Sequence, residues 1–134
     1  MQVAVDWKNS LGFSALGPSG LPVELSGNAD NPGLSPMELM AFALAGCTGM
    51  DVISILQKKR QPVQAFQVRV NTERREEYPK VWTHVLVEYI VSGEGVEAAA
   101  VERAIELSTQ KYCPAYNMLK HAVQIDSRFE IRPA

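Results

Sequence analysis

The sequence predicts an α+β fold in which antiparallel sheets surround one long, buried central helix. The predicted strands at the start of the chain are grouped as hairpins and do not alternate with helices, which favours antiparallel pairing. An uncharged, apolar stretch follows from Leu39 to Met50. The chain has 134 residues, of which 46% are apolar, so it can bury a core without a disulfide or a metal. We therefore expect a single domain over residues 1–134.

Three strands are predicted before the central helix. Over residues 3–7 apolar side chains alternate with polar ones, which is typical of a half-buried strand. The segments Gly12–Leu16 and Leu21–Ser26 flank the turn sequence at residues 17–20, so we expect a hairpin. Residues 27–33 are rich in Gly, Asn and Asp and are predicted to form a loop.

The central helix is predicted from Ser35 to about Lys59. Ser35 is a favourable N-cap, Pro36 suits the first helical position, and Glu38 completes a capping box. A cluster of cations at the other end complements the helix dipole. The middle of this helix is apolar on nearly every side, and such a helix is normally surrounded by protein.

One small sheet cannot bury all sides of such a helix. We therefore expect a homodimer in which the two chains share their central helices. Membrane insertion is not expected, because Glu38 and Asp51 bracket an apolar stretch that is too short to cross a bilayer.

The second half of the chain alternates strands with helices. We expect strands at Phe66–Glu73 and Val81–Val91, an amphipathic helix at Val96–Lys111, a short helix from Cys113 to about His121, and a last strand over residues 123–132. The predicted order is therefore β-β-β-α-β-β-α-α-β.

The charge balance argues against a nucleic-acid partner. Thirteen basic and fifteen acidic residues give a net charge of −2, whereas domains that bind nucleic acid usually carry a basic excess. Residues 1–8 resemble a strand more than a charged leader followed by an apolar segment, so we expect a cytoplasmic protein. In that reducing compartment, two cysteines do not make a structural disulfide framework.

The two cysteines are the main candidates for reactive residues. Cys47 lies in the predicted buried helix and is either an apolar core residue or a reactive thiol. The neighbouring Gly46 and Gly49 each cost the helix roughly 1 kcal/mol and leave space for a ligand or another chain. Cys113 precedes Pro114 at a helix N-terminus, where the dipole lowers a thiol pKa, although it could also be a chance cysteine before a proline.

Together the two thiols permit peroxide reduction. A thiolate attacks a peroxide to form a sulfenic acid, and a second thiol condenses with it to a disulfide that a reductant reopens.

Three motifs resemble the OsmC/Ohr family, and the resemblance is closest to its YhfA-like branch. They are SPMEL at Ser35–Leu39, ALAGC at Ala43–Cys47, and YCPAYNML at Tyr112–Leu119. The resemblance implies an OsmC-like fold, an intertwined homodimer, and a two-cysteine site at the subunit interface that reduces organic hydroperoxides. It further implies that Cys47 is the peroxidatic cysteine and Cys113 the resolving one.

The chain departs from the peroxidases of this family in the residues that hold their thiolate. Those members pair an arginine of the N-terminal half with a glutamate just after the helix proline. Here Met37 occupies the glutamate position, and no arginine precedes Arg60. Glu38 is not a substitute, because it falls on the opposite side of the helix from Cys47.

Asp51 is a possible thiolate-tuning partner. It lies four residues after Cys47, on the same face of the helix. Paired with Arg69, Arg74 or Arg75 it would recreate a cysteine, acid and arginine cluster; alternatively it is a hydrogen-bonding helix residue at the dimer contact.

We therefore expect a thiol-dependent peroxidase that acts on organic hydroperoxides in oxidative-stress defence and uses a dithiol reductant. One alternative is a non-catalytic binding or sensing protein, whose interface pocket, lined by Met37, Met40 and Met50, holds a small apolar or reactive ligand. A structural dimer with inert cysteines is another. No organic cofactor is expected, and no metal, because His84 and His121 lack metal-binding spacing.

Overall fold

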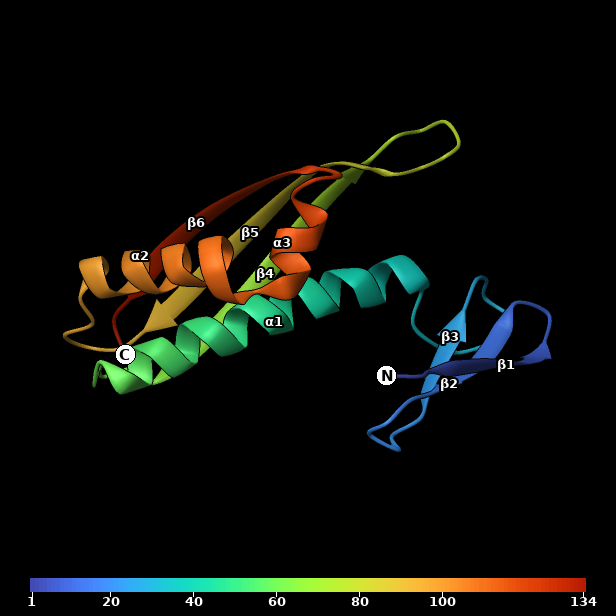
Figure 1. The fold of residues 1–134 in the computed structure, drawn as a ribbon, viewed down its shortest axis with the longest axis horizontal. Helices are drawn as coiled ribbons and strands as arrows, with labels where there is room; N and C mark the ends of the chain where they lie inside the picture. The colour runs from blue at the N-terminus through green and yellow to red at the C-terminus, as the bar shows by residue number, and fades with distance from the viewer. The chain divides into compact units, whose positions relative to one another are not determined.

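The computed structural model describes residues 1–134 and has the predicted order of elements (Figure 1). Six strands and three α-helices are present, with a short π-helical turn between the second and third helices. The chain divides into two compact units, Met1–Met40 and Ala41–Ala134, which are described in turn. The single domain over residues 1–134 stays a prediction.

The first unit contains a three-stranded antiparallel sheet. Its strands are β1 (Ala4–Asn9), β2 (Gly12–Leu16) and β3 (Val23–Ser26), in the order β1-β2-β3. The predicted hairpin between β2 and β3 is confirmed. The predicted half-burial of the first strand is wrong, because all six residues of β1 are exposed.

The central helix α1 (Pro36–Lys58) begins and ends close to the predicted positions. At its start, the Glu38 N–H donates to the Ser35 Oγ over 3.1 Å, which is the expected N-cap. The reciprocal side-chain bond of a full capping box does not form. At its end, Arg60 adopts a left-handed conformation with φ of 56°. The Gln61 N–H then bonds the Leu56 carbonyl over 3.0 Å, so the last turn closes as a Schellman motif.

The sheet of the second unit contains β4 (Ala65–Arg74), β5 (Trp82–Ser92) and β6 (Gln124–Arg132), in that order. Strands β4 and β5 pair antiparallel, as predicted for neighbouring strands. Strands β5 and β6 pair parallel, so the expectation of purely antiparallel sheets is wrong here. The pairing is parallel because the helices between β5 and β6 return the chain to the end of the sheet at which β5 begins.

That connection consists of α2 (Ala98–Leu107), the π turn η1 (Ser108–Tyr112) and α3 (Pro114–Leu119). The sequence predicted one helix through Lys111, but α-helical geometry stops at Leu107. The π turn that follows widens the helix by one residue per turn just before Cys113.

The core of the second unit lies between the helices and one face of its sheet (Figure 1). Alternate residues of β5 point into it, and Val85, Val87 and Tyr89 are fully buried. Helix α1 buries one stripe against this face, whereas its Phe42 is 56% exposed and its Met50 is 72% exposed. The second unit therefore covers only one side of the helix that was expected to be surrounded by protein.

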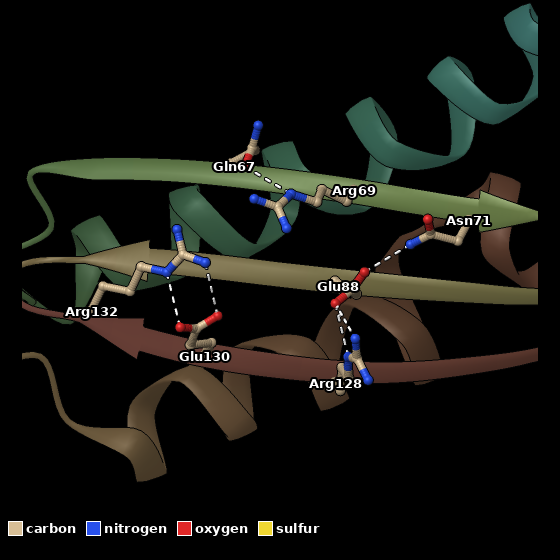
Figure 2. A network of polar contacts seen from close by, with 7 residues as sticks. All are labelled: Gln67, Arg69, Asn71, Glu88, Arg128, Glu130 and Arg132. Carbon is tan, nitrogen blue, oxygen red and sulfur yellow. Dashed lines mark hydrogen bonds and ion pairs between the residues drawn. The ribbon is translucent and has the colours of Figure 1, made fainter.

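The opposite face of this sheet is polar (Figure 2). The Glu88 carboxylate accepts hydrogen bonds from Arg128 over 2.6 and 2.8 Å and from Asn71 over 2.7 Å. Arg132 and Glu130 form a second ion pair on the same face. The arginines of both pairs are exposed, so this face lies at the surface of the unit, on the side of the sheet away from the helices.

The expectation that the apolar stretch is too short for a membrane span is wrong, because helix α1 has the length and composition of one, as the core helix of a soluble protein can have. Its polar residues nevertheless bond to other elements of the second unit, as described below.

Candidate functional site

Cys47 and Cys113 come together from two different elements of the second unit. Cys47 is half-buried on α1, and Cys113 is fully buried at the N-cap of α3. The two thiols lie close enough for Cys47 to contribute to the raised pKa of the Cys113 thiol. The structure thus brings two thiols together that lie far apart in the sequence.

The predicted low pKa of Cys113 is wrong. Its Sγ accepts a hydrogen bond from the Tyr116 N–H over 3.3 Å, which is the expected helix-cap interaction and lowers the pKa. Burial outweighs that bond and raises the pKa to about 11, with smaller contributions from Cys47 and Asp51 in the same direction. Helix α3 has only six residues, so its N-terminus offers a buried thiolate little compensation.

Asp51 lies one turn after Cys47, but it pairs with a serine and not with an arginine. Its Oδ2 accepts a hydrogen bond from the Ser108 Oγ over 2.9 Å. Of the three arginines that were expected as partners, Arg69 donates to Gln67 and Arg74 donates to the Lys80 carbonyl, and Arg75 makes no ion pair with Asp51. The predicted cluster of cysteine, acid and arginine therefore does not form within this chain.

Sequence reasoning missed a buried row of hydroxyl groups that ends at Asp51. The Thr48 Oγ1 lies 2.7 Å from the Tyr89 hydroxyl and 2.8 Å from the Ser108 Oγ. All three residues are fully buried. One signal was available, because Thr48 is a polar residue directly after Cys47 in an otherwise apolar stretch. Its partners are 41 and 60 residues away, which no local pattern reveals.

The π turn connects this row of hydroxyls to the second cysteine. The Ser108 carbonyl accepts a hydrogen bond from the Cys113 N–H over 2.8 Å. Ser108 therefore holds Asp51 through its side chain and Cys113 through its backbone. Single π turns inside helices are frequent at functional sites.

Two hollows open beside α1. An apolar groove of about 410 Å³ is lined by both glycines that flank Cys47, by Phe42 and Met50 of the same helix, and by Phe66 of β4. Of the three methionines expected in a ligand pocket, Met50 lines this groove. Met37 and Met40 belong to the first unit.

The second hollow lies on the Asp51 side of the helix. It has a volume of about 270 Å³ and is lined by Asp51, Ser54, Lys58 and Tyr112, among others. The Asp51 carboxylate therefore borders open space at one end of the buried hydroxyl row.

His84 pairs with an acidic residue at the surface. Its Nε2 lies 2.7 Å from the Asp126 carboxylate, which lowers the pKa of that carboxyl group. No group of three or more histidine, cysteine and acidic side chains gathers in the geometry of a metal site.

Comparisons with known proteins agree with this fold. The sequence profile described as OsmC-like protein matches residues 27–128, more than half of the chain. Protein YhfA of Escherichia coli strain K12 is 42% identical over 131 residues, which cover 98% of each chain.

Two solved structures illustrate the structural similarity. A hypothetical protein from Aquifex aeolicus VF5 superposes with a TM-score of 0.90 at 31% identity, covering 99% of this chain and 96% of that chain. The organic hydroperoxide resistance protein OsmC from Legionella pneumophila superposes with a TM-score of 0.72, covering 97% of each chain. At 12% identity, the latter likeness concerns the fold alone.

Proposed function

Because the chain belongs to the OsmC-like family, we propose that it is a thiol-dependent peroxidase that reduces organic hydroperoxides through Cys47 and Cys113. The observation that carries the proposal is the proximity of the two thiols in one chain, one half-buried and one fully buried, which lets Cys47 act on the pKa of Cys113. A protein of the same fold that is named for organic hydroperoxide resistance supports the choice of substrate class.

The proposed reaction has three steps. The Cys47 thiolate attacks one oxygen of the hydroperoxide, the O–O bond breaks, and the departing alkoxide takes up a proton to become an alcohol. Cys47 is then a sulfenic acid. The Cys113 sulfur attacks the Cys47 sulfur, water leaves, and a disulfide forms between them. A dithiol from the surrounding cytoplasm reduces this disulfide by thiol exchange.

The difference in burial between the two sulfurs fits these roles. A peroxidatic sulfur must meet the substrate, and Cys47 retains solvent exposure. A resolving sulfur meets only its partner, so the complete burial of Cys113 is compatible with that role. Burial also protects Cys113 from reacting with peroxide, because at a pKa of about 11 it stays protonated near neutral pH.

The test is the intact mass of the reduced protein after one equivalent of cumene hydroperoxide, together with a count of free thiols. We expect the loss of two hydrogen atoms and of both thiols within one chain. A Cys113→Ser variant is expected to stop at the sulfenic acid, which dimedone traps, and a Cys47→Ser variant is expected not to react.

An unchanged mass with both thiols free would contradict the peroxidase proposal. The apolar groove of about 410 Å³ favours a binding or sensing role as the second candidate. Thermal stabilisation of the unreacted protein by the same hydroperoxide would support that role, since a ligand that binds only the folded state raises its stability.

A further inference from the structure

Ser108 connects the helix that carries Cys47 to the turn that carries Cys113. Its Oγ donates to the Asp51 Oδ2 over 2.9 Å, and its carbonyl accepts from the Cys113 N–H over 2.8 Å. Thr48 and Asp51 follow Cys47 on α1, one and four residues later. The position of the second sulfur relative to the first therefore depends on this one buried serine.

The carboxylate sets the direction of the whole hydroxyl row. Each hydroxyl has one proton to donate. Ser108 donates its hydroxyl proton to Asp51, so it must accept a hydrogen bond from the Thr48 hydroxyl. Thr48 must in turn accept a hydrogen bond from the Tyr89 hydroxyl. Hydrogen bonds are therefore donated in one direction along the row, from the buried Tyr89 to Asp51, and the last of them fixes one carboxylate oxygen. The other oxygen, Oδ1, accepts no hydrogen bond in the structure.

The second sulfur needs a proton acceptor. With a pKa of about 11, only about one Cys113 in 10⁴ is a thiolate at neutral pH. The titratable groups that act on it are Cys47 and Asp51 from α1 and Tyr89 from β5, whereas Tyr116 of α3 contacts it through its backbone N–H. Burial raises the pKa of both tyrosines, so both stay protonated. Asp51 is the carboxylate among these groups.

We propose that Asp51 accepts the Cys113 proton when the disulfide closes, and that Ser108 is the positioning residue that holds its carboxylate for this transfer. The inference rests on the proposed two-cysteine function and names the base for its second step. The Cys113 S–H bond breaks and the proton passes to Asp51. The Cys113 sulfur then bonds the Cys47 sulfur, the Cys47 S–O bond breaks, and the departing hydroxide becomes water when it regains a proton.

The surroundings of Asp51 allow the proton to leave. Asp51 borders the hollow of about 270 Å³, and Lys58 lines the same hollow. The proton can therefore pass from Asp51 to solvent without crossing the apolar core.

The test isolates the second step without using a peroxide. Reduced protein is mixed anaerobically with 5,5′-dithiobis(2-nitrobenzoate), and the release of the coloured thiolate is followed by stopped flow. The first phase reports the mixed disulfide at Cys47, with the Cys113→Ser variant as its reference. The second phase reports attack by Cys113, which breaks the mixed disulfide and releases a second coloured thiolate.

We expect Asp51→Asn to slow the second phase about 100-fold and to leave the first phase unchanged, as expected for loss of a general base. Ser108→Ala and Thr48→Val are expected to slow the second phase about tenfold, because the carboxylate loses its fixed orientation. Thr109→Val is the matched control. Its hydroxyl lies in the same π turn but bonds only backbone carbonyls, and both phases should keep their wild-type rates.

The pH profile separates a base from a merely structural residue. In the wild type the second-phase rate should change little around neutral pH, whereas in Asp51→Asn it should rise about tenfold per pH unit, as hydroxide becomes the base. A second phase of Asp51→Asn within about twofold of the wild type would overturn the inference. If that variant does not fold, a tenfold rise per pH unit in the wild type itself would overturn it. A normal two-phase reaction combined with no reaction toward hydroperoxide would count against the proposed substrate and leave this inference standing.

Discussion

At Cys113, two physical effects act on one sulfur in opposite directions. The Tyr116 N–H stabilises the thiolate, and removal of the thiol from water destabilises it. A single hydrogen bond of 3.3 Å is too weak to offset complete burial, so the protonated form prevails. In the proposed reaction, the half-buried Cys47 sulfur would meet the oxidant, and the buried, protonated Cys113 sulfur would not.

This balance predicts how stability depends on pH. The pKa of Cys113 is raised from its ordinary value of 9.0 to about 11, so the folded state holds this proton more tightly than the unfolded state. The stabilisation is complete below about pH 9 and is lost as the pH rises to about 11, with a total of about 2–3 kcal/mol. Urea unfolding at a series of alkaline pH values checks this prediction.

The matched variants are Cys113→Ala and Cys47→Ala. Cys113→Ala should lose less free energy of unfolding between about pH 9 and pH 11 than the wild type. Cys47→Ala should retain a loss close to that of the wild type over the same range. Equal pH slopes in Cys113→Ala and the wild type would show that this thiol is not the buried titrating group.

At the scale of elements, local sequence patterns were sufficient to predict nearly every segment. Alternation located the strands, and the Ser35 and Pro36 pair located the start of α1. The parallel pairing of β5 and β6 was missed although the sequence carried its signal, because a helix between two strands favours a parallel crossover. The π turn had no such signal, since its sequence is compatible with a continuing α-helix.

The candidate site was only partly predictable for the same reason. The two cysteines and Asp51 could be named from motif and helix periodicity, because their relation is local or recurs in a family. The roles of Ser108 and Tyr89 depend on packing between α1, β5 and the π turn. Such contacts between distant segments follow from the whole fold and not from any window of sequence.

The two glycines of α1 looked alike in the sequence but differ in the structure. A Cβ added to Gly49 would lie 3.1 Å from the Val68 Cγ2, so this glycine lets the helix approach β4 closely. A Cβ added to Gly46 would meet nothing within 4 Å. Close packing therefore explains one glycine, whereas the other keeps the apolar groove open.

This difference predicts opposite effects of substitution. Gly46→Ala should stabilise the single folded chain by up to about 1 kcal/mol, because alanine favours the helix and finds free space within that chain. Gly49→Val should destabilise it by about 1–3 kcal/mol, because the larger side chain forces α1 away from β4. Thermal and urea unfolding of the two variants at one protein concentration measure both effects. A stabilised Gly49→Val variant would show that the close contact with Val68 does not limit the helix position.

At the scale of the whole molecule, one side of α1 presents large apolar side chains that the second unit does not cover. Phe42 and Met50 are large, apolar and more than half exposed, and both line the groove beside Phe66. A side chain such as Phe42 gains stability when another surface removes it from water. We propose that a second copy of the chain supplies that surface, as expected from the apolar character of the helix and from membership of this family.

The homodimer predicts that a charge on this face prevents association. Phe42→Glu should weaken the dimer by at least about 100-fold, because the carboxylate would have to be buried at the interface without a partner. Sedimentation velocity over a series of concentrations measures the change. Tyr78→Glu is the control, because Tyr78 is an exposed aromatic residue in the loop after β4 that does not line the groove, and the variant should remain dimeric.

The melting temperature of the wild type should also rise with protein concentration, and that of Phe42→Glu should not, because association stabilises only the folded chains that form the dimer. A wild-type protein that sediments as a monomer at every concentration would contradict the proposal, and the exposed face of α1 would then be left for a ligand in the groove.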